Sequence, residues 1–436
     1  MTLVTLQNTL PTIWTIACLV IVCLAYFQRA KPHIFLWAAA GLSLLTFGLP
    51  LLSQWPQTPL LGIHGKPIGA DWAAFWLAAE QTAQFKTAQA YDTPNFLKAF
   101  QEAFGKEEYF AWQYPPTTSL ALTPLTLLPY GIGALIWLLG PALWLLVTLC
   151  RTFPSNQTDP PVIAIALACP ALLINLAYGQ TGALIAVLML LATTHINARP
   201  HLSGTAMGLI WFKPHFGVLL PFAVIGARAW KTGLIAGSTI VLWLILSLIH
   251  EGLDPWRAWI SALIDAPSRI TKEILGGPFT SWYAFVTNLT GQKAFGYGAQ
   301  ILSAAVAITA IVLVFQKSLC PHIRLAVLTT GALTVSPYTM FYDWVLIVPA
   351  VIVLTRSTAI QDLRIASLLG ITPLFPLLMW ESGSINGLIH SGGPLASIIF
   401  FLTLRRALQA MKHDQETVKA GVAMLPTSDA TTASTT

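Results

Sequence analysis

Charged residues are scarce in this chain, and their scarcity excludes a water-soluble fold. Only 9% of the 436 residues are Asp, Glu, Lys or Arg, whereas 55% are hydrophobic and the mean hydropathy is +0.68. A soluble domain cannot bury so much apolar surface, so the composition predicts a protein that crosses a membrane many times. Backbone groups in lipid must pair within their own segment, and the apolar runs are long, so we expect an all-α polytopic membrane protein.

Several motifs of cofactor chemistry are also missing. The sequence has no GxxxxGK[ST], no GxGxxG after a strand pattern, no HExxH and no GxSxG. The five cysteines form no CxxC pair, so we predict neither disulfides nor a metal site, and we expect no cofactor. The basic pI reflects charge placed on one side of a membrane rather than a nucleic-acid surface, so no nucleic-acid partner is expected.

Apolar runs of about 20 residues mark the expected membrane spans. Residues 203–227 are interrupted at Lys213-Pro214, and we interpret them as two short helices that form a hairpin. The first 27 residues lack a basic start and read as an anchor helix rather than a cleaved signal. The candidate spans are residues 10–27, 34–54, 131–150, 161–178, 180–195, 232–249, 298–316, 323–337, 340–355, 364–380 and 388–404.

The basic residues predict the orientation. If the N-terminus lies outside, the short inner loops and the tail hold 14 Lys and Arg against 5 acids, and the outer side holds 8 against 12. An excess of Lys and Arg in short loops marks the cytoplasmic side. Residues 55–130 and 250–297 then become two outer, periplasmic segments of a domain spanning 1–412, and residues 413–436 form a disordered cytoplasmic tail. Within the first segment, residues 72–90 suit a helix at the membrane interface.

Asp71-Trp72 stands just outside an apolar run and begins the interfacial pattern. A carboxylate at the outer membrane face can accept the proton of an attacking alcohol, so Asp71 is the candidate catalytic base. Asp71 would equally suit the N-cap of the following helix, and the two roles can coexist.

Lys213 and His215 lie inside an apolar run next to a helix-breaking proline. An intramembrane lysine is costly and usually faces a cavity or a partner, so Lys213 could bind a lipid phosphate, and His215 could add a hydrogen bond. The alternative is a lysine that extends its amine to the membrane surface beside a hydrogen-bonded core histidine.

Three further motifs hold candidate contacts for sugar or acceptor. Tyr114 belongs to an aromatic-proline turn, which could stack on a sugar or form an interfacial aromatic belt. Gln180 follows a Tyr-Gly turn, where it could bond hydroxyls or satisfy the turn itself. Tyr338 and Asp343 follow a Ser-Pro pair; Asp343 could serve as a second acid, as the partner of Lys213 or as a helix cap.

Taken in order along residues 70–345, these motifs resemble glycosyltransferase family 87, the polyprenol-phosphate-sugar-dependent branch of the GT-C superfamily. The motifs that carry the resemblance are Asp71-Trp72 with Ala90-Tyr91-Asp92, Tyr114-Pro115-Pro116, Tyr178-Gly179-Gln180, Trp211-Phe212-Lys213-Pro214, and Ser336-Pro337-Tyr338 with Tyr342-Asp343.

The resemblance implies a GT-C-like bundle, with about 11–13 transmembrane helices by the spans above. It also implies an inner-membrane enzyme that acts on the periplasmic side. A polyprenyl-phosphate sugar, often mannose, would be the donor, and a lipid or glycan hydroxyl would attack it with inversion. By this resemblance Asp71 is the base. We expect Lys213 and His215 at the donor phosphate, and Trp72, Tyr114, Gln180, Tyr338 and Asp343 around the sugar and acceptor.

Two other classes stay open from the sequence. A lipid-glycan ligase or polymerase would share the topology but usually relies on arginines at the outer face, where only Arg257 and Arg269 are available. A secondary transporter would show repeats in its hydropathy, and none is visible.

Overall fold

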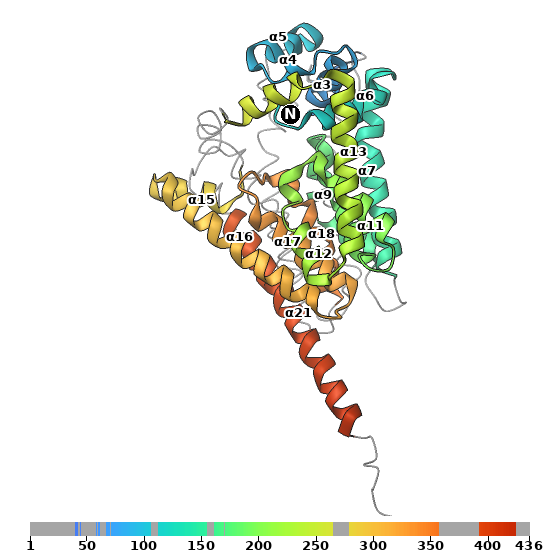
Figure 1. The fold of residues 1–436 in the computed structure, drawn as a ribbon, viewed down its shortest axis with the longest axis vertical. Coiled ribbons are helices and arrows are strands. Elements are labelled where there is room, and N and C mark those ends of the chain that lie inside the picture. The colour runs from blue at the N-terminus through green and yellow to red at the C-terminus, as the bar shows by residue number, and fades with distance from the viewer. Residues whose placement is uncertain are drawn as a thin grey trace, which may run out of the picture.

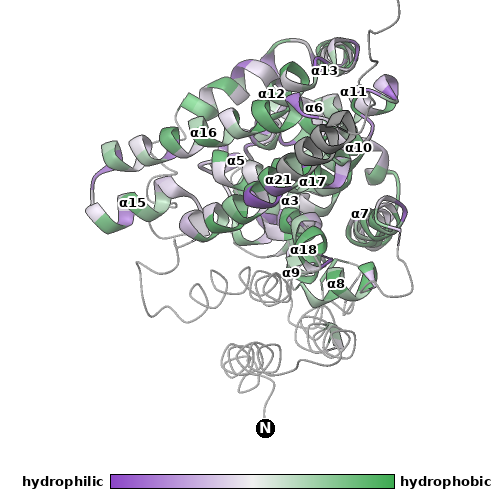
Figure 2. Ribbon diagram, turned by 90° about the horizontal axis from the view of Figure 1, so that it is seen from below, coloured by the Kyte–Doolittle hydropathy of each residue, from purple (hydrophilic) through white to green (hydrophobic). Residues whose placement is uncertain are grey.

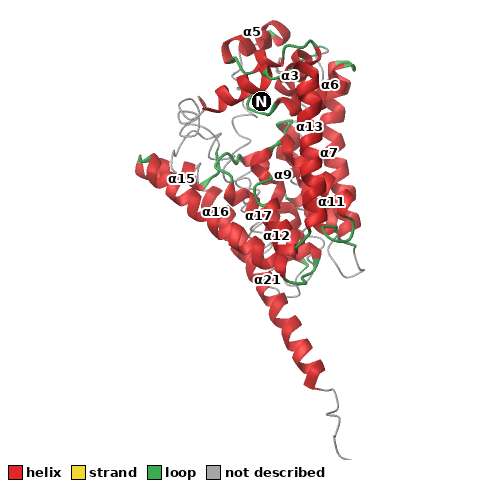
Figure 3. Ribbon diagram, viewed as in Figure 1, coloured by secondary structure: helices red, strands yellow, loops and turns green. Residues whose placement is uncertain are grey.

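The computed structural model describes residues 71–105, 112–154, 161–169, 171–264, 279–356 and 392–423, with a few single positions between residues 40 and 69. Side chains of the last helix are described as far as Met411. In these ranges the structure is helical with short connections and contains no extended strand (Figure 3). The expected spans 10–27, 34–54 and 364–380 lie outside the described residues, apart from single positions in the second.

The elements are α3 (Trp72–Ala83), α4 (Thr87–Ala90), α5 (Thr93–Phe104), α6 (Pro116–Thr126), α7 (Tyr130–Thr152), α8 (Val162–Ala168), α9 (Ala171–Ala177), α10 (Gly182–Thr194), α11 (Pro200–Leu209), η1 (Ile210–Phe212), η2 (Pro214–Phe216), α12 (Leu220–Ala227), α13 (Trp230–Glu251), α15 (Trp282–Thr290), α16 (Lys293–Gln316), α17 (Pro321–Val335), η3 (Phe341–Ile347), α18 (Val348–Thr355) and α21 (Gly392–Ala423).

Three of these helices, α7, α13 and α16, are long and apolar enough to cross a membrane. Their hydrophobic side chains remain largely exposed, as on α7 at Leu135, Leu139 and Leu143. In a soluble protein such a surface would be unstable, whereas in a bilayer it contacts lipid tails. Figure 2 shows hydrophobic residues through most of the bundle. The expected all-α membrane fold is therefore confirmed.

The molecule has two distinct ends (Figure 1). At one end α3, α4 and α5 pack beside the end of α13, where the Thr87 N–H donates to both oxygens of Glu251 at 3.1 and 3.2 Å. At the other end the residues that follow α18 meet those that follow α7, since the Arg356 guanidinium donates to the Pro154 carbonyl at 3.1 Å. Residues 72–105 and 251–264 thus share one end, as expected if these parts of 55–130 and 250–297 lie on one side of the membrane (Figure 1).

The expected hairpin at 203–227 is present. Asn197, just before α11, donates to the carbonyl of Ala227 at 3.4 Å, so the chain enters and leaves at the same end. Gly204 and Gly208 let α11 lie against α13, because a Cβ at Gly208 would come within 2.5 Å of the Thr239 Cβ. Lys213 lies between η1 and η2 at the tip of this hairpin, and its side chain is buried in the bundle.

The expected span 161–178 is broken into α8 and α9. Cys169, between them, has extended backbone angles, φ −83° and ψ 108°. The reason is Pro170, which disfavours a helical conformation in the residue before it. The sequence pattern was apolar throughout, so hydropathy alone missed this break.

One expectation within residues 55–130 needs correction. Residues 72–90 form two helices, and α3 is buried in the protein on most sides rather than lying along a surface. The amphipathic helix at this end is α5, which buries Phe96, Phe100 and Phe104 at four-residue spacing. At the C-terminal side α21 continues to Ala423, past residue 413, where the expected tail begins, and the expectation of a disordered tail stays a prediction. Residues 424–436 lie outside the described part.

Candidate active site

A tight turn brings Gln180 to Asp71. Gly179 has φ +63°, and a Cβ there would lie 1.9 Å from the Gly69 carbonyl oxygen, so only glycine fits. The Asp71 N–H donates to the Tyr178 carbonyl at 3.2 Å, which fastens the start of α3 to this turn. The close backbone approach explains why a Tyr-Gly-Gln turn occurs here.

Asp71, Gln180 and Tyr114 form a hydrogen-bonded group, which we call the Asp71 cluster. The Gln180 Nε2 donates to Asp71 Oδ2, and the Tyr114 hydroxyl donates to Gln180 Oε1 at 3.3 Å. Asp71 occupies the N-cap position of α3, but its side chain accepts no capping hydrogen bond. The carboxylate is half-buried. Of the two roles considered for Asp71, the side-chain cap is therefore wrong.

Tyr114 is held as a neutral donor. Burial, followed by the negative charges of Asp343 and Asp71, raises the pKa of its phenol well above the usual value. Both carboxylates therefore act on the same phenol, which ties the Asp71 cluster to the surroundings of Asp343. Its ring packs on Phe75 with centroids 4.8 Å apart, and its carbonyl accepts from the Tyr91 hydroxyl at 2.8 Å.

Lys213 and Asp343 form a buried ion pair, the Lys213 pair, with Nζ and Oδ1 2.7 Å apart. The second carboxylate oxygen accepts from the Met340 N–H at 3.0 Å, so Asp343 also caps η3. The Lys213 ammonium lies 5.2 Å and 5.4 Å from the ring centroids of Phe216 and Tyr342. Two of the roles considered for Asp343, partner of Lys213 and cap, are present. Each Asp343 oxygen already accepts a hydrogen bond within the protein, so the third role, that of a second acid for acceptor hydroxyls, is not supported.

Asn175 joins the two groups and was missed from the sequence. Its side-chain amide nitrogen donates to the backbone carbonyl of Tyr342 at 3.1 Å. Its backbone carbonyl accepts from the Gln180 N–H at 3.1 Å. The side-chain oxygen accepts from Ala183 N at 3.1 Å. A buried Asn inside the apolar run 161–178 was the available signal, because such a side chain needs partners.

The remaining candidates divide between core and open surface. His215 packs on Phe216 and near Tyr338, and its buried Nε2 has no partner among the described residues. Tyr338 is 41% exposed. Trp72 is fully buried and stacks on Trp137 with centroids 5.4 Å apart. It therefore belongs to the packed core next to Asp71 and is not exposed to a sugar or acceptor.

No group of three His, Cys, Asp or Glu side chains gathers as metal ligands would within the ranges that the structure describes. The expectation that the protein has no metal site stays a prediction.

Comparison with known proteins identifies the family. The model of glycosyltransferase family 87 matches residues 112–337. These residues include Tyr114, Gln180, Lys213 and His215, whereas Asp71 precedes the match. No solved structure matches the chain significantly.

Two curated relatives are mycobacterial, and both bear the name polyprenol-phosphate-mannose-dependent alpha-(1-2)-phosphatidylinositol pentamannoside mannosyltransferase. The protein of Mycolicibacterium smegmatis is 27% identical over 301 residues, which are 65% of this chain and 70% of the relative. The protein of Mycobacterium tuberculosis is 23% identical over 289 residues, or 62% and 65% of the two chains. Since the family model covers more than half of the chain, this protein belongs to glycosyltransferase family 87 and is a membrane glycosyltransferase.

Proposed function

We propose that the protein transfers mannose from a polyprenyl-phosphate donor to a hydroxyl of a lipid or glycan acceptor, with inversion at the anomeric carbon. The donor and sugar follow the names of the two relatives. The reaction takes place at the periplasmic face of a bacterial inner membrane, on the side to which the charge distribution assigns residues 55–130.

The observation that carries the proposal is the Asp71 cluster. Asp71 is half-buried, and a neutral amide orients its carboxylate without neutralising it. An acceptor hydroxyl that donates to the other carboxylate oxygen would be positioned for proton transfer. Its oxygen attacks the anomeric carbon as the bond from that carbon to the phosphate oxygen breaks, and Asp71 takes the proton. The electron pair leaves with the polyprenyl phosphate.

The donor phosphate belongs near the Lys213 pair. An ammonium has three N–H donors, and the ion pair with Asp343 uses one of them, so Lys213 can bond a phosphate oxygen while it keeps this partner. His215 lies two residues on with an unpartnered Nε2, a suitable second donor. The rings of Phe216 and Tyr342 beside the ammonium exclude water and strengthen its attraction for an anion. The polyprenyl tail would then lie in lipid.

The test is transfer by the purified protein in liposomes that contain polyprenyl-phosphate mannose labelled in the sugar. We expect label to move to a membrane-extracted acceptor fraction, and NMR of the product to show an anomeric configuration opposite to that of the donor. GDP-mannose given in place of the lipid donor should yield no product. Transfer from GDP-mannose, or retention of configuration, would contradict the proposal.

A further inference from the structure

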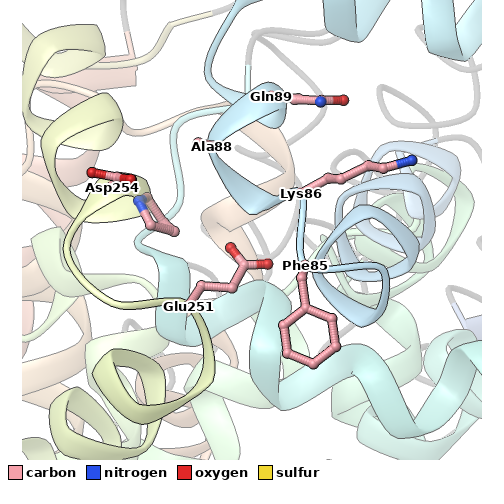
Figure 4. A pocket seen from close by; sticks show the side chains of 7 residues that line it. Phe85, Lys86, Ala88, Gln89, Glu251 and Asp254 are labelled. Carbon is pink, nitrogen blue, oxygen red and sulfur yellow. The ribbon is translucent and has the colours of Figure 1, made fainter.

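A pocket lies at the end of the molecule that holds α4 and α5, between the turn after α3, the start of α4 and the end of α13 (Figure 4). Its volume is about 300 Å³. The side chains that line it include Phe85, Lys86, Gln89, Glu251 and Asp254. None of these residues belongs to the Asp71 cluster or the Lys213 pair.

Phe85 presents an aromatic face beside this pocket. The ring is 67% exposed, and one side of it stacks on His250 with centroids 4.5 Å apart. The His250 ring is fixed in turn by a 2.8 Å hydrogen bond between Nε2 and the Thr82 carbonyl. Phe85 also has φ +57°, a conformation that costs a non-glycine residue free energy. A large, exposed ring in a strained turn is unfavourable for stability alone, which points to a binding role.

Polar groups converge beside the ring. Figure 4 shows the Glu251 carboxylate between Asp254 and Phe85. Each Glu251 oxygen accepts from the Thr87 N–H, which leaves lone pairs on both for further donors. Gln89 adds an amide that can donate and accept. An exposed aromatic face combined with carboxylate and amide groups suits a sugar ring, whose C–H faces pack on aromatics and whose hydroxyls donate to carboxylates.

The pocket is separated from Asp71 by the length of α3. This helix has 12 residues, so its two ends lie about 18 Å apart. A monosaccharide is too short to contact both the pocket and Asp71, whereas an oligosaccharide is long enough. We propose that this pocket, lined by Phe85 and Glu251, binds a remote sugar unit of an oligosaccharide acceptor whose terminal hydroxyl reaches Asp71. The proposal rests on the proposed function for the identity of the site at Asp71.

The test measures binding rather than turnover, so it is independent of catalysis. Ligand-observed NMR titration would determine the Kd of a linear α-linked mannotetraose for the purified protein. We expect Phe85→Ala to weaken binding about tenfold, Phe85→Trp to retain it, and Glu251→Gln to weaken it less. Leu127→Ala, which removes an 85% exposed side chain at the end of α6, is the matched control and should bind as the wild type does.

Acceptors of different length provide the second measurement. Phe85→Ala should raise the KM for an alkyl mannotetraoside and leave the KM for an alkyl monomannoside unchanged. If the wild type does not bind mannotetraose, or if Phe85→Ala and Glu251→Gln both bind it normally, the pocket is no sugar subsite even when transfer occurs. If transfer fails but binding still depends on Phe85, the proposed function is wrong and the subsite stands.

Discussion

Asp71 is oriented by a neutral partner, and this has a consequence for pH dependence. Gln180 donates to the Asp71 carboxylate, and in a Gln180→Glu variant a second carboxylate would stand in its place. Two adjacent carboxylates resist joint ionisation, so Asp71 would lose its proton only at higher pH. Since a general base must be deprotonated, the acid limb of the rate profile should move to higher pH. The measurement is kcat against pH for Gln180→Glu and Gln180→Met.

The methionine variant is the control. It removes the hydrogen bond without adding charge, so it should lower kcat at every pH and move the acid limb to higher pH by less than Gln180→Glu does. An unmoved limb in Gln180→Glu would show that Asp71 does not supply the titrating base.

Lys213 serves two roles that mutation can separate. Lys213→Met leaves the Asp343 carboxylate buried and unpaired, which typically costs 3–5 kcal/mol, so the melting temperature should fall. Lys213→Met with Asp343→Asn removes both charges and keeps an acceptor for the Met340 N–H, so most of the stability should return. The KM for the polyprenyl-phosphate donor should exceed the wild-type value in both the single and the double variant. If the double variant recovered donor affinity along with stability, Lys213 would be structural.

At the scale of elements, the hairpin of α11 and α12 decides the topology. It enters and leaves at one end, so α13 carries the chain back to the end that holds α3, α4 and α5. A hairpin that spanned once would place residues 72–105 and 254–264 on opposite sides of the membrane.

Cysteine labelling tests this arrangement. After the native cysteines are replaced, Lys98→Cys and Asp254→Cys should react with an impermeant maleimide in intact spheroplasts. Lys231→Cys, at the other end of α13, should react only after permeabilisation. All three positions are exposed. Labelling at 98 with protection at 254 would show a single crossing, and protection of both would reverse the orientation.

For the whole molecule, the sequence predicted the class of fold, but it did not predict which candidate site residues contact one another. Hydropathy sufficed for the all-α membrane class, because lipid requires every spanning segment to satisfy its own backbone hydrogen bonds, and the interruption at Lys213-Pro214 sufficed for the hairpin. The bond from Gln180 to Asp71 joins residues 109 apart, and the Lys213 pair joins residues 130 apart. No local sequence pattern encodes contacts between residues so far apart along the chain. The sequence therefore left Asp343 with three possible roles: a second acid, the partner of Lys213 or a helix cap.

Two other features were missed for different reasons. The break in 161–178 followed from Pro170, a signal that was visible but outweighed by the apolar run. The pocket at Phe85 could not be predicted, because it depends on a left-handed residue after α3 and on a helix end more than 160 residues away, as the contact between Thr87 and Glu251 records.

The central claim is that Asp71 removes the proton of the acceptor, and one measurement tests it most directly. Single-turnover transfer from polyprenyl-phosphate mannose would be compared between the wild type and Asp71→Asn in the same liposomes. The amide keeps the size of the side chain but cannot take the proton. The rate should fall about 100- to 10,000-fold, while donor binding stays within about twofold. Wild-type single-turnover rates in Asp71→Asn would contradict the account.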